Sequence, residues 1–384
     1  MLPYSESSLS AQTAYAQLLE AGLAADHHRS VADLKGSFAS KVSKGKTYWY
    51  YQYVEPSGKL RQVYVGPDNE AVRVLREQKA ARDAPARMEA LARLARSAAA
   101  LGCNEILPRH ARVLARLSEY GFFRAGGVLV GTHAFLAFGN MLGVRWKDSD
   151  RTQDVDFAHA GKSLSIALPG NIQVNTDAAI KSLEMGFLPV SSLTSEAGAT
   201  YLNPREPEFR LDFLTTRHRD REKTYSHPRL GVNMQPLPFM EYSLEDVQQA
   251  VLFSGDTVVL ANVPSPARYA LHKLIVYGER KGAFATKSTK DLKQAGLLLL
   301  RLKELRPSDI TEAWRDLVGR GPGWRSRARA GAAALSKQFP ELNVKQLLAE
   351  PAARGNGAVP KKEVARTRRV SGGRPVKKRN AGSK

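Results

Sequence analysis

The chain contains a single cysteine, Cys103, so it cannot form an internal disulfide bond. It also lacks an uninterrupted apolar run of about 18 residues, the length that a membrane-spanning helix requires. Its first residues, MLPYSESSLSAQTAYAQ, have neither the basic start nor the apolar centre of a secretory signal peptide. These absences predict a cytoplasmic protein that has no membrane partner.

Acidic residues are also few, with 37 Asp and Glu against 58 Lys and Arg, which gives a formal net charge of +21 over 384 residues. The segment 351–384 alone carries eleven basic residues and one Glu, without apolar periodicity. Such a basic tail cannot bury a core and is expected to be disordered. The charge favours polyanionic partners, namely nucleoside triphosphates, RNA, DNA or an anionic surface. The alternative is a basic protein that its charge merely keeps soluble.

The length predicts two or three domains, and the pattern predicts the α+β class. Helical spacing dominates near the N-terminus, strand and helix patterns alternate in the middle, and proline-started helices follow Pro266. We therefore expect five segments: an N-terminal helical segment (1–34), a β-hairpin or meander plus helices (35–118), a core with a short mixed sheet and flanking helices (119–262), a helical domain (263–349) and the basic tail (350–384).

The hairpin is expected from two runs of β-forming residues, 47–54 and 60–65, which a Pro-Ser-Gly-Lys turn separates. A third strand over 36–42 would make it a meander. Interleaved aromatic and basic residues suit nucleic-acid contact. The alternative, which we favour, is that Trp49 and alternate tyrosines pack under the following helix, because a bare meander is unstable.

A tight Gly131-Thr132 turn is expected between a strand over 123–130 and a helix over 133–142. Glycine at such a junction lets backbone N–H groups approach a phosphate, and the start of the helix adds partial positive charge. Thr132 adds a hydroxyl donor. A purely structural turn is the alternative, since strand–glycine–helix turns are common.

Two acids, Asp154 and Asp156, alternate with the apolar residues Val155 and Phe157. Residues two apart in a strand share a face, so both carboxylates project together. Adjacent carboxylates repel unless a cation lies between them, and Mg²⁺ prefers oxygen ligands. A solvated edge strand is the alternative.

A third acid, Asp212, lies in the alternating run Phe209-Arg210-Leu211-Asp212-Phe213. A carboxylate on a neighbouring strand could complete a metal cluster or accept a proton from an attacking hydroxyl. The alternative is a surface ion pair between Arg210 and Asp212.

In this order, the Gly131-Thr132 turn, Asp154/Asp156 and Asp212 resemble the DNA-polymerase-β-like nucleotidyltransferase superfamily. More narrowly, the stretch GTHAFLAFGNMLGVRW followed by TQDVDFA resembles a poorly characterised bacterial family with the nucleotidyltransferase fold. The resemblance implies that the three aspartates are catalytic and bind Mg²⁺, and that Gly131 and Thr132 hold a nucleoside triphosphate. Two departures are Thr132 in place of Ser or Gly and the long gap from Gly131 to Asp154.

The resemblance also implies that a basic residue on a helix of the following segment contacts the triphosphate. Lys273 is the first candidate, and Arg280, Lys287 and Lys290 follow it. A solvated helical lysine is the alternative in so basic a chain. His133 lies one residue past the turn and could reach a phosphate, although a capping or packing role is more usual at such a position.

The sequence thus predicts a Mg²⁺-dependent nucleotidyltransferase that transfers a nucleoside monophosphate from a nucleoside triphosphate to a hydroxyl acceptor. The acceptor, which the sequence does not identify, could be a small molecule, a protein or an RNA. The alternative is a protein that binds RNA or DNA through the basic tail and the hairpin and retains an inactive nucleotidyltransferase fold.

Overall fold

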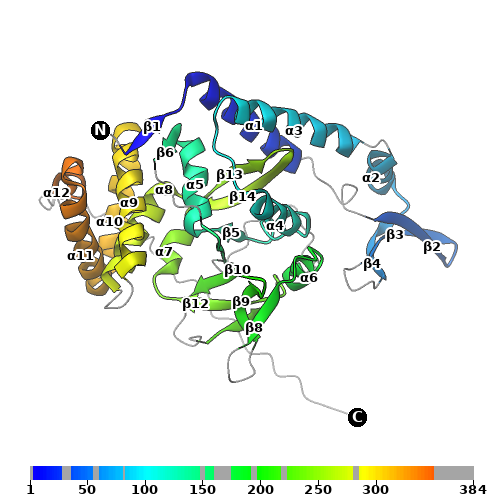
Figure 1. Cartoon of the computed structure of the whole chain (residues 1–384). Coiled ribbons are helices and arrows are strands. Elements are labelled where there is room, and N and C mark those ends of the chain that lie inside the picture. The colour runs from blue at the N-terminus through cyan, green and yellow to red at the C-terminus, as the bar shows by residue number, and fades with distance from the viewer. Residues whose placement is uncertain are drawn as a thin grey trace, which may run out of the picture. The chain divides into compact units, whose positions relative to one another are not determined.

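A computed structural model describes the backbone of residues 3–27, 36–54, 60–80, 83–147, 152–159, 174–191, 197–217, 223–279 and 285–349 (Figure 1). The predicted basic tail lies outside these residues. Helices and sheets occur together, as the α+β class requires. No helix among the described residues combines the length and the apolar character needed to cross a bilayer. The five predicted segment boundaries remain a prediction.

A seven-stranded mixed sheet forms the centre of the fold. Strand β10 runs parallel to β7 and β12, whereas β9 pairs with it antiparallel. Strand β5 pairs antiparallel with the other side of β7 and forms one edge of the sheet, and β8 and β11 are the other outer strands. The strands are β5 (Gly127–Leu129), β7 (Val155–His159), β8 (Leu188–Ser191), β9 (Ala197–Asn203), β10 (Glu206–Thr216), β11 (Tyr225–His227) and β12 (Val232–Leu237).

Alternation along β7 and β10 gives the sheet one apolar and one acidic face. Phe157 and Phe213 are fully buried and stack with their ring centroids 5.2 Å apart. Leu211 is buried beside them. The apolar faces predicted for these two strands are confirmed. The acids occupy the alternate positions, whose side chains lie on the opposite face.

The strand expected over 123–130 is much shorter in the structure. Only Gly127–Leu129 pairs with β7, and the preceding residues form turns. The backbone N–H of Ala125 bonds to the oxygen of Gly121 at 2.9 Å, as in a helical turn. The prediction was wrong because the apolar run signals burial, which turns can satisfy as well as a strand can.

Four helices flank the sheet: α4 (Pro108–Glu119), α5 (Gly131–Met141), α6 (Thr176–Lys181) and α7 (Met240–Leu244). A long hairpin, β13 (Val247–Ser254) and β14 (Thr257–Pro264), packs beside them. The Asn262 side chain on β14 donates hydrogen bonds to the backbone oxygens of Phe123 and Gly127, and so ties the hairpin to β5.

The helical segment after Pro266 consists of α8 (Pro266–Glu279), α9 (Ala285–Leu305), α10 (Pro307–Gly319), α11 (Pro322–Gln338), a short turn of 3₁₀ helix (Pro340–Leu342) and α12 (Val344–Leu347). Helical spacing predicted helices over 268–280, 291–306 and 307–318, which correspond to α8, α9 and α10, whereas α11 was not predicted. Helix α11 packs so closely on α8 that a Cβ atom at Gly331 would lie 2.2 Å from the backbone oxygen of Leu274. Its small residues give little apolar periodicity, which hides the helix in the sequence.

The N-terminal region contributes β1 (Tyr4–Glu6) and α1 (Leu9–His27). Strand β1, which was not predicted, pairs antiparallel with β6 (Val144–Trp146). Helix α1 packs with α3 (Asp83–Ala100) against the β13–β14 hairpin through Leu18, Ala95 and Phe253.

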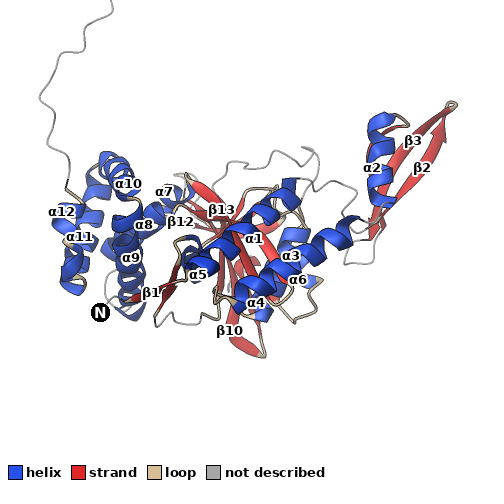
Figure 2. Cartoon of the chain, turned by 90° about the horizontal axis from the view of Figure 1, so that it is seen from above, coloured by secondary structure: helices blue, strands red, loops and turns tan. Residues whose placement is uncertain are grey.

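The predicted meander is a three-stranded antiparallel sheet of β2 (Ser37–Ser43), β3 (Lys46–Val54) and β4 (Leu60–Pro67). Helix α2 (Glu70–Ala80) lies along one face of it (Figure 2). Tyr51 is 1% exposed on the helix-covered face. The expected packing of alternate aromatic residues under the following helix is confirmed.

Candidate metal and nucleotide site

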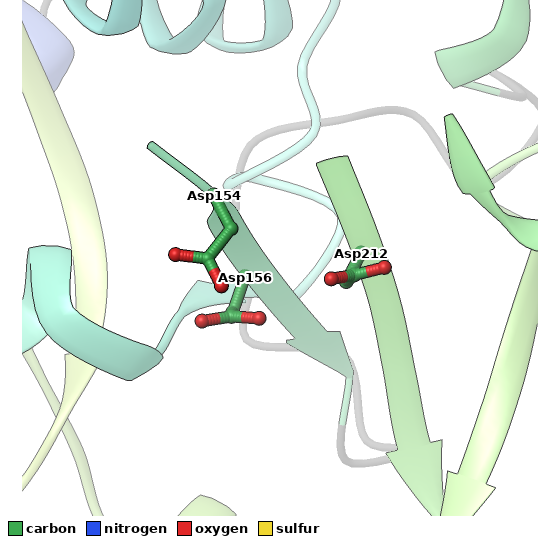
Figure 3. A group of neighbouring side chains, drawn as sticks. All are labelled: Asp154, Asp156 and Asp212. Atoms are coloured by element: carbon green, nitrogen blue, oxygen red, sulfur yellow. The ribbon is translucent and has the colours of Figure 1, made fainter. Parts of the chain in front are cut away.

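Asp154, Asp156 and Asp212 converge at one point of the central sheet (Figure 3). Asp156 lies on β7 and Asp212 on β10, directly opposite one another in the parallel pairing of the two strands. Asp154 immediately precedes β7 and lies on the same face as Asp156, two residues away. One carboxylate oxygen from each residue lies within 4.8 Å of the other two. Three carboxylate oxygens this close could hold a divalent cation.

The environment of Asp156 opposes its negative charge. Burial raises its pKa to about 7, and the charges of Asp154 and Asp212 act in the same direction. Lys273 and Arg210 oppose this shift. In the metal-free protein this carboxyl group therefore titrates near neutral pH, and a bound cation would favour its ionised form.

The other two acids are held by threonine hydroxyls. Burial, the largest single influence, tends to raise the pKa of Asp154. The hydrogen bond from the Thr152 hydroxyl group, a backbone hydrogen bond and the charges of Arg210 and Lys290 together outweigh burial, so the pKa is lowered. Thr200, on the neighbouring strand β9, donates to Asp212 Oδ1 at 2.6 Å. These two bonds restrain the orientation of the Asp154 and Asp212 carboxylates.

Arg210 lies between two of the acids. Its Nη2 atom is 3.7 Å from Asp154 Oδ2, and its Nε atom is 3.5 Å from Asp212 Oδ2. The ion pair that we considered as an alternative thus exists together with the acid cluster. Because the Arg210 side chain is 40% exposed, it has room to move when a cation or a substrate phosphate arrives.

The turn before α5 is built against Asp156. Val130 N–H donates to the backbone oxygen of Asp156 at 2.9 Å, and Gly131 has a positive φ of 61°. A Cβ atom on Gly131 would lie 2.0 Å from Asp156 Oδ2, so only glycine fits. Val130, at the N-cap of α5, makes no side-chain hydrogen bond to the start of the helix, and within the described part of the chain the first N–H groups of α5 could therefore meet an anion beside the acids. Thr132 lies in the same turn and is 8% exposed.

Replacing Gly131 with alanine is expected to impair metal binding as well as stability. The left-handed backbone alone costs about 1–2 kcal/mol, and the Cβ atom would also displace the Asp156 carboxylate. Gly255→Ala is the matched control, because Gly255 has a φ of +53° with open space around its Cβ position. Thermal unfolding with and without Mg²⁺ should show a Mg²⁺-induced stabilisation that Gly255→Ala retains and Gly131→Ala loses. Equal responses from both variants would contradict the steric account.

Helix α8 is joined to the turn by Tyr269, whose hydroxyl group donates to the backbone oxygen of Gly131 at 2.8 Å. One helical turn later, Lys273 Nζ is 2.5 Å from Asp291 Oδ1, and both side chains are 13% exposed. Lys273 is near enough to Asp156 to lower its pKa. Its predicted contact with a triphosphate therefore requires it to exchange or share Asp291.

Lys290 is the second lysine near the acids. Its positive charge lowers the pKa values of Asp154 and His133. It is half-buried on α9, one residue before Asp291. Of the other two candidates, Arg280 and the side chain of Lys287 lie outside the described residues. Lys290 therefore lies close enough to the acids to be a candidate for the phosphate contact beside Lys273.

His133 packs inside the fold. It is 1% exposed, and its Nε2 atom lies 2.8 Å from Nδ1 of His110, which is equally buried. The pKa of His133 is lowered to about 3, mainly by burial and also by the neighbouring His110. A neutral packing residue is the interpretation that these contacts favour.

The structure adds Thr152, Thr200 and Tyr269 to the residues that shape the site. Thr152 stands two positions before Asp154, a local signal that the sequence could have offered. Thr200 and Tyr269 reach the site only through strand pairing and helix packing, for which the sequence holds no local pattern.

The region that forms this site matches a family model described as Nucleotidyltransferase, over residues 108–319. Among solved structures, the chain is similar to an antigenic nucleotidyltransferase-like protein from Paracoccidioides brasiliensis. The two share 15% sequence identity, with 59% of this chain and 95% of that chain covered and a TM-score of 0.30. A TM-score this low supports no inference. No curated protein matches the chain.

Proposed function

Because the chain belongs to the nucleotidyltransferase family, we propose that it transfers a nucleoside monophosphate from a nucleoside triphosphate to a hydroxyl group, with Mg²⁺ as cofactor. The observation that carries the proposal is the convergence of Asp154, Asp156 and Asp212 beside the uncapped start of α5. A cation site next to an anion site is the arrangement that a metal-bound triphosphate requires.

The three carboxylates fit Mg²⁺ by their chemistry. Their oxygens are hard ligands, and a bound cation would relieve the repulsion from Asp154 and Asp212 that, together with burial, raises the pKa of Asp156. When bound, Mg²⁺ would neutralise phosphate charge and help to stabilise the transition state.

The chain's own residues supply positioning and proton transfer. The first N–H groups of α5, with Thr132, hold the terminal phosphates. Asp212, fixed through Oδ1 by Thr200, accepts the proton of the acceptor hydroxyl group. The acceptor oxygen then bonds to the α-phosphorus, the bond from that phosphorus to the bridging oxygen breaks, and pyrophosphate leaves.

The direct test is transfer of radiolabel from each of the four α-³²P nucleoside triphosphates in the presence of Mg²⁺. Total cellular RNA, total cellular protein and a small-molecule extract serve in turn as acceptors. Wild type should label one of them, and Asp154→Asn should not. Equal labelling by both proteins would refute the assignment of the site, and no labelling by wild type would favour the inactive binding protein.

The two lysines are expected to differ when replaced. Lys290→Ala should weaken binding of a nucleoside triphosphate about tenfold and leave stability unchanged, because no ion pair of the described residues holds Lys290. Lys273→Ala should lower stability by about 1–3 kcal/mol, because it removes the Lys273–Asp291 ion pair, whose two side chains are each only 13% exposed. Isothermal titration with a non-hydrolysable triphosphate and thermal unfolding measure the two effects. A larger loss of triphosphate affinity in Lys273→Ala than in Lys290→Ala would show that Lys273, and not Lys290, is the main phosphate contact.

A further inference from the structure

The three-stranded sheet β2–β3–β4 has two faces of different chemistry. Helix α2 covers one of them, where the Arg76 guanidinium group lies 3.5 Å from the centroid of the Trp49 ring. Trp49 Nε1 also donates to Asp68 at 3.2 Å, and Tyr51 is buried. Trp49 and Tyr51 of this covered face therefore take part in the packing of the sheet against α2.

The opposite face, called here the open face, carries the side chains that alternate with Trp49 and Tyr51. They contact one another: Lys41 Nζ lies 4.8 Å from the Tyr50 ring centroid and donates to Gln62 at 2.7 Å. Tyr64 is 51% exposed and meets Tyr50 edge-on, with the ring centroids 5.5 Å apart. The open face consists mainly of Lys41, Lys46, Tyr48, Tyr50, Gln62 and Tyr64.

Charge is segregated between the two faces. No residue of the three strands is acidic. Among the described residues next to the sheet, Asp68 accepts a hydrogen bond from Trp49 of the covered face, and Glu70 of α2 pairs with Arg73 at 3.7 Å. At the exposed tip of the β2–β3 hairpin, Lys44 and Gly45 both have positive φ, 49° and 71°, as in a two-residue type I′ turn. The open face and its tip therefore offer lysines, hydroxyl groups and an amide to a polyanion.

We propose that the open face binds double-stranded DNA in the major groove, with Lys41, Lys44 and Lys46 against the phosphates. Three strands about 4.8 Å apart span roughly 10 Å between the outer two, which fits a groove about 12 Å wide. The major groove of duplex RNA is too deep and narrow for a sheet. Stacking of single-stranded bases requires free aromatic faces, and the Tyr50 ring is already engaged by Lys41 and Tyr64. This binding does not depend on nucleotidyl transfer.

The test uses the full chain and a fluorescent DNA duplex of about 20 base pairs in an anisotropy titration over a salt series. The Lys41→Gln/Lys46→Gln variant removes two charges from the open face. Its matched control, Arg73→Gln/Arg93→Gln, removes two charges from exposed helical positions. We expect the first variant to bind about tenfold more weakly, with a salt slope shallower by about two, and the control to stay within about twofold of wild type.

Equal loss in the two variants, or none in either, would overturn the proposal, because binding would then follow net charge or another segment. Tighter binding of the same sequence as single-stranded DNA or as duplex RNA would also overturn it. Acetylation of wild type by an amine-reactive reagent gives a second readout that no folding defect can mimic. The duplex should protect Lys41 and Lys46 and leave the exposed Lys337 and Lys345 reactive; equal protection of all four would contradict the assigned face.

Discussion

Asp156→Asn is expected to abolish nucleotidyl transfer and at the same time to stabilise the metal-free protein. Transfer should fall by roughly a thousandfold or more, because the variant loses the ligand at the centre of the acid cluster. The free energy of unfolding should be higher in the variant than in wild type near pH 8. The reason is that the pKa of Asp156 is raised from 3.8 to about 7, so its ionised form is disfavoured in the folded protein. A gain on the order of 2 kcal/mol is expected after allowance for solvent screening.

The sign of this effect can be checked with pH. An acid whose pKa is raised by folding binds its proton more tightly in the folded state, so its unfavourable contribution grows as pH rises from about 4 to about 7. The stability difference between Asp156→Asn and wild type, measured in EDTA by chemical denaturation, should therefore be small near pH 4 and large near pH 8. A variant less stable than wild type at both values would show that the acid cluster is not repulsive.

Mg²⁺ is expected to stabilise wild type strongly at neutral pH and weakly in acid. At a Mg²⁺ concentration of about 100 times the dissociation constant, the stabilisation should reach about 2.7 kcal/mol. Because the cation binds the ionised carboxylate, affinity should fall about tenfold per pH unit below the Asp156 pKa of about 7 and level off above it. Thermal unfolding over a Mg²⁺ series at several pH values measures both quantities.

Asp212→Asn is the control for that experiment. It removes a cluster ligand on a different strand but retains the hydrogen bond from Thr200. The fold should survive while the Mg²⁺ response disappears. Persistence of a full, pH-dependent response in this variant would place the cation elsewhere.

The acid site could be predicted because its information is local. Asp154 and Asp156 share a face through the period of a strand, and Phe209, Leu211 and Phe213 fix the face of Asp212 in the same way. The pairing of β7 with β10, which puts Asp212 directly opposite Asp156, followed from the resemblance alone. Strand alternation predicts the face of the sheet on which a side chain lies, but it does not predict which strand is the neighbour.

The partners of the lysines could not be predicted, because they depend on how the helices pack. Lys273 and Asp291 are 18 residues apart, and only the packing of α8 against α9 brings them together. Strand β1 and helix α11 were not predicted, for related reasons. Strand β1 is only three residues long and is recognisable as a strand only through its pairing with β6. Helix α11 packs against α8 through small residues.

The most direct test of the metal site is a crystal of wild type grown with Mn²⁺ and a non-hydrolysable nucleoside triphosphate, with diffraction recorded for the anomalous signal of manganese. We expect a manganese peak bonded to oxygens of Asp154, Asp156 and Asp212, with the phosphates at the start of α5. Manganese and phosphates bound at another place, with the three aspartates contacting only Arg210 and the threonines, would contradict the account.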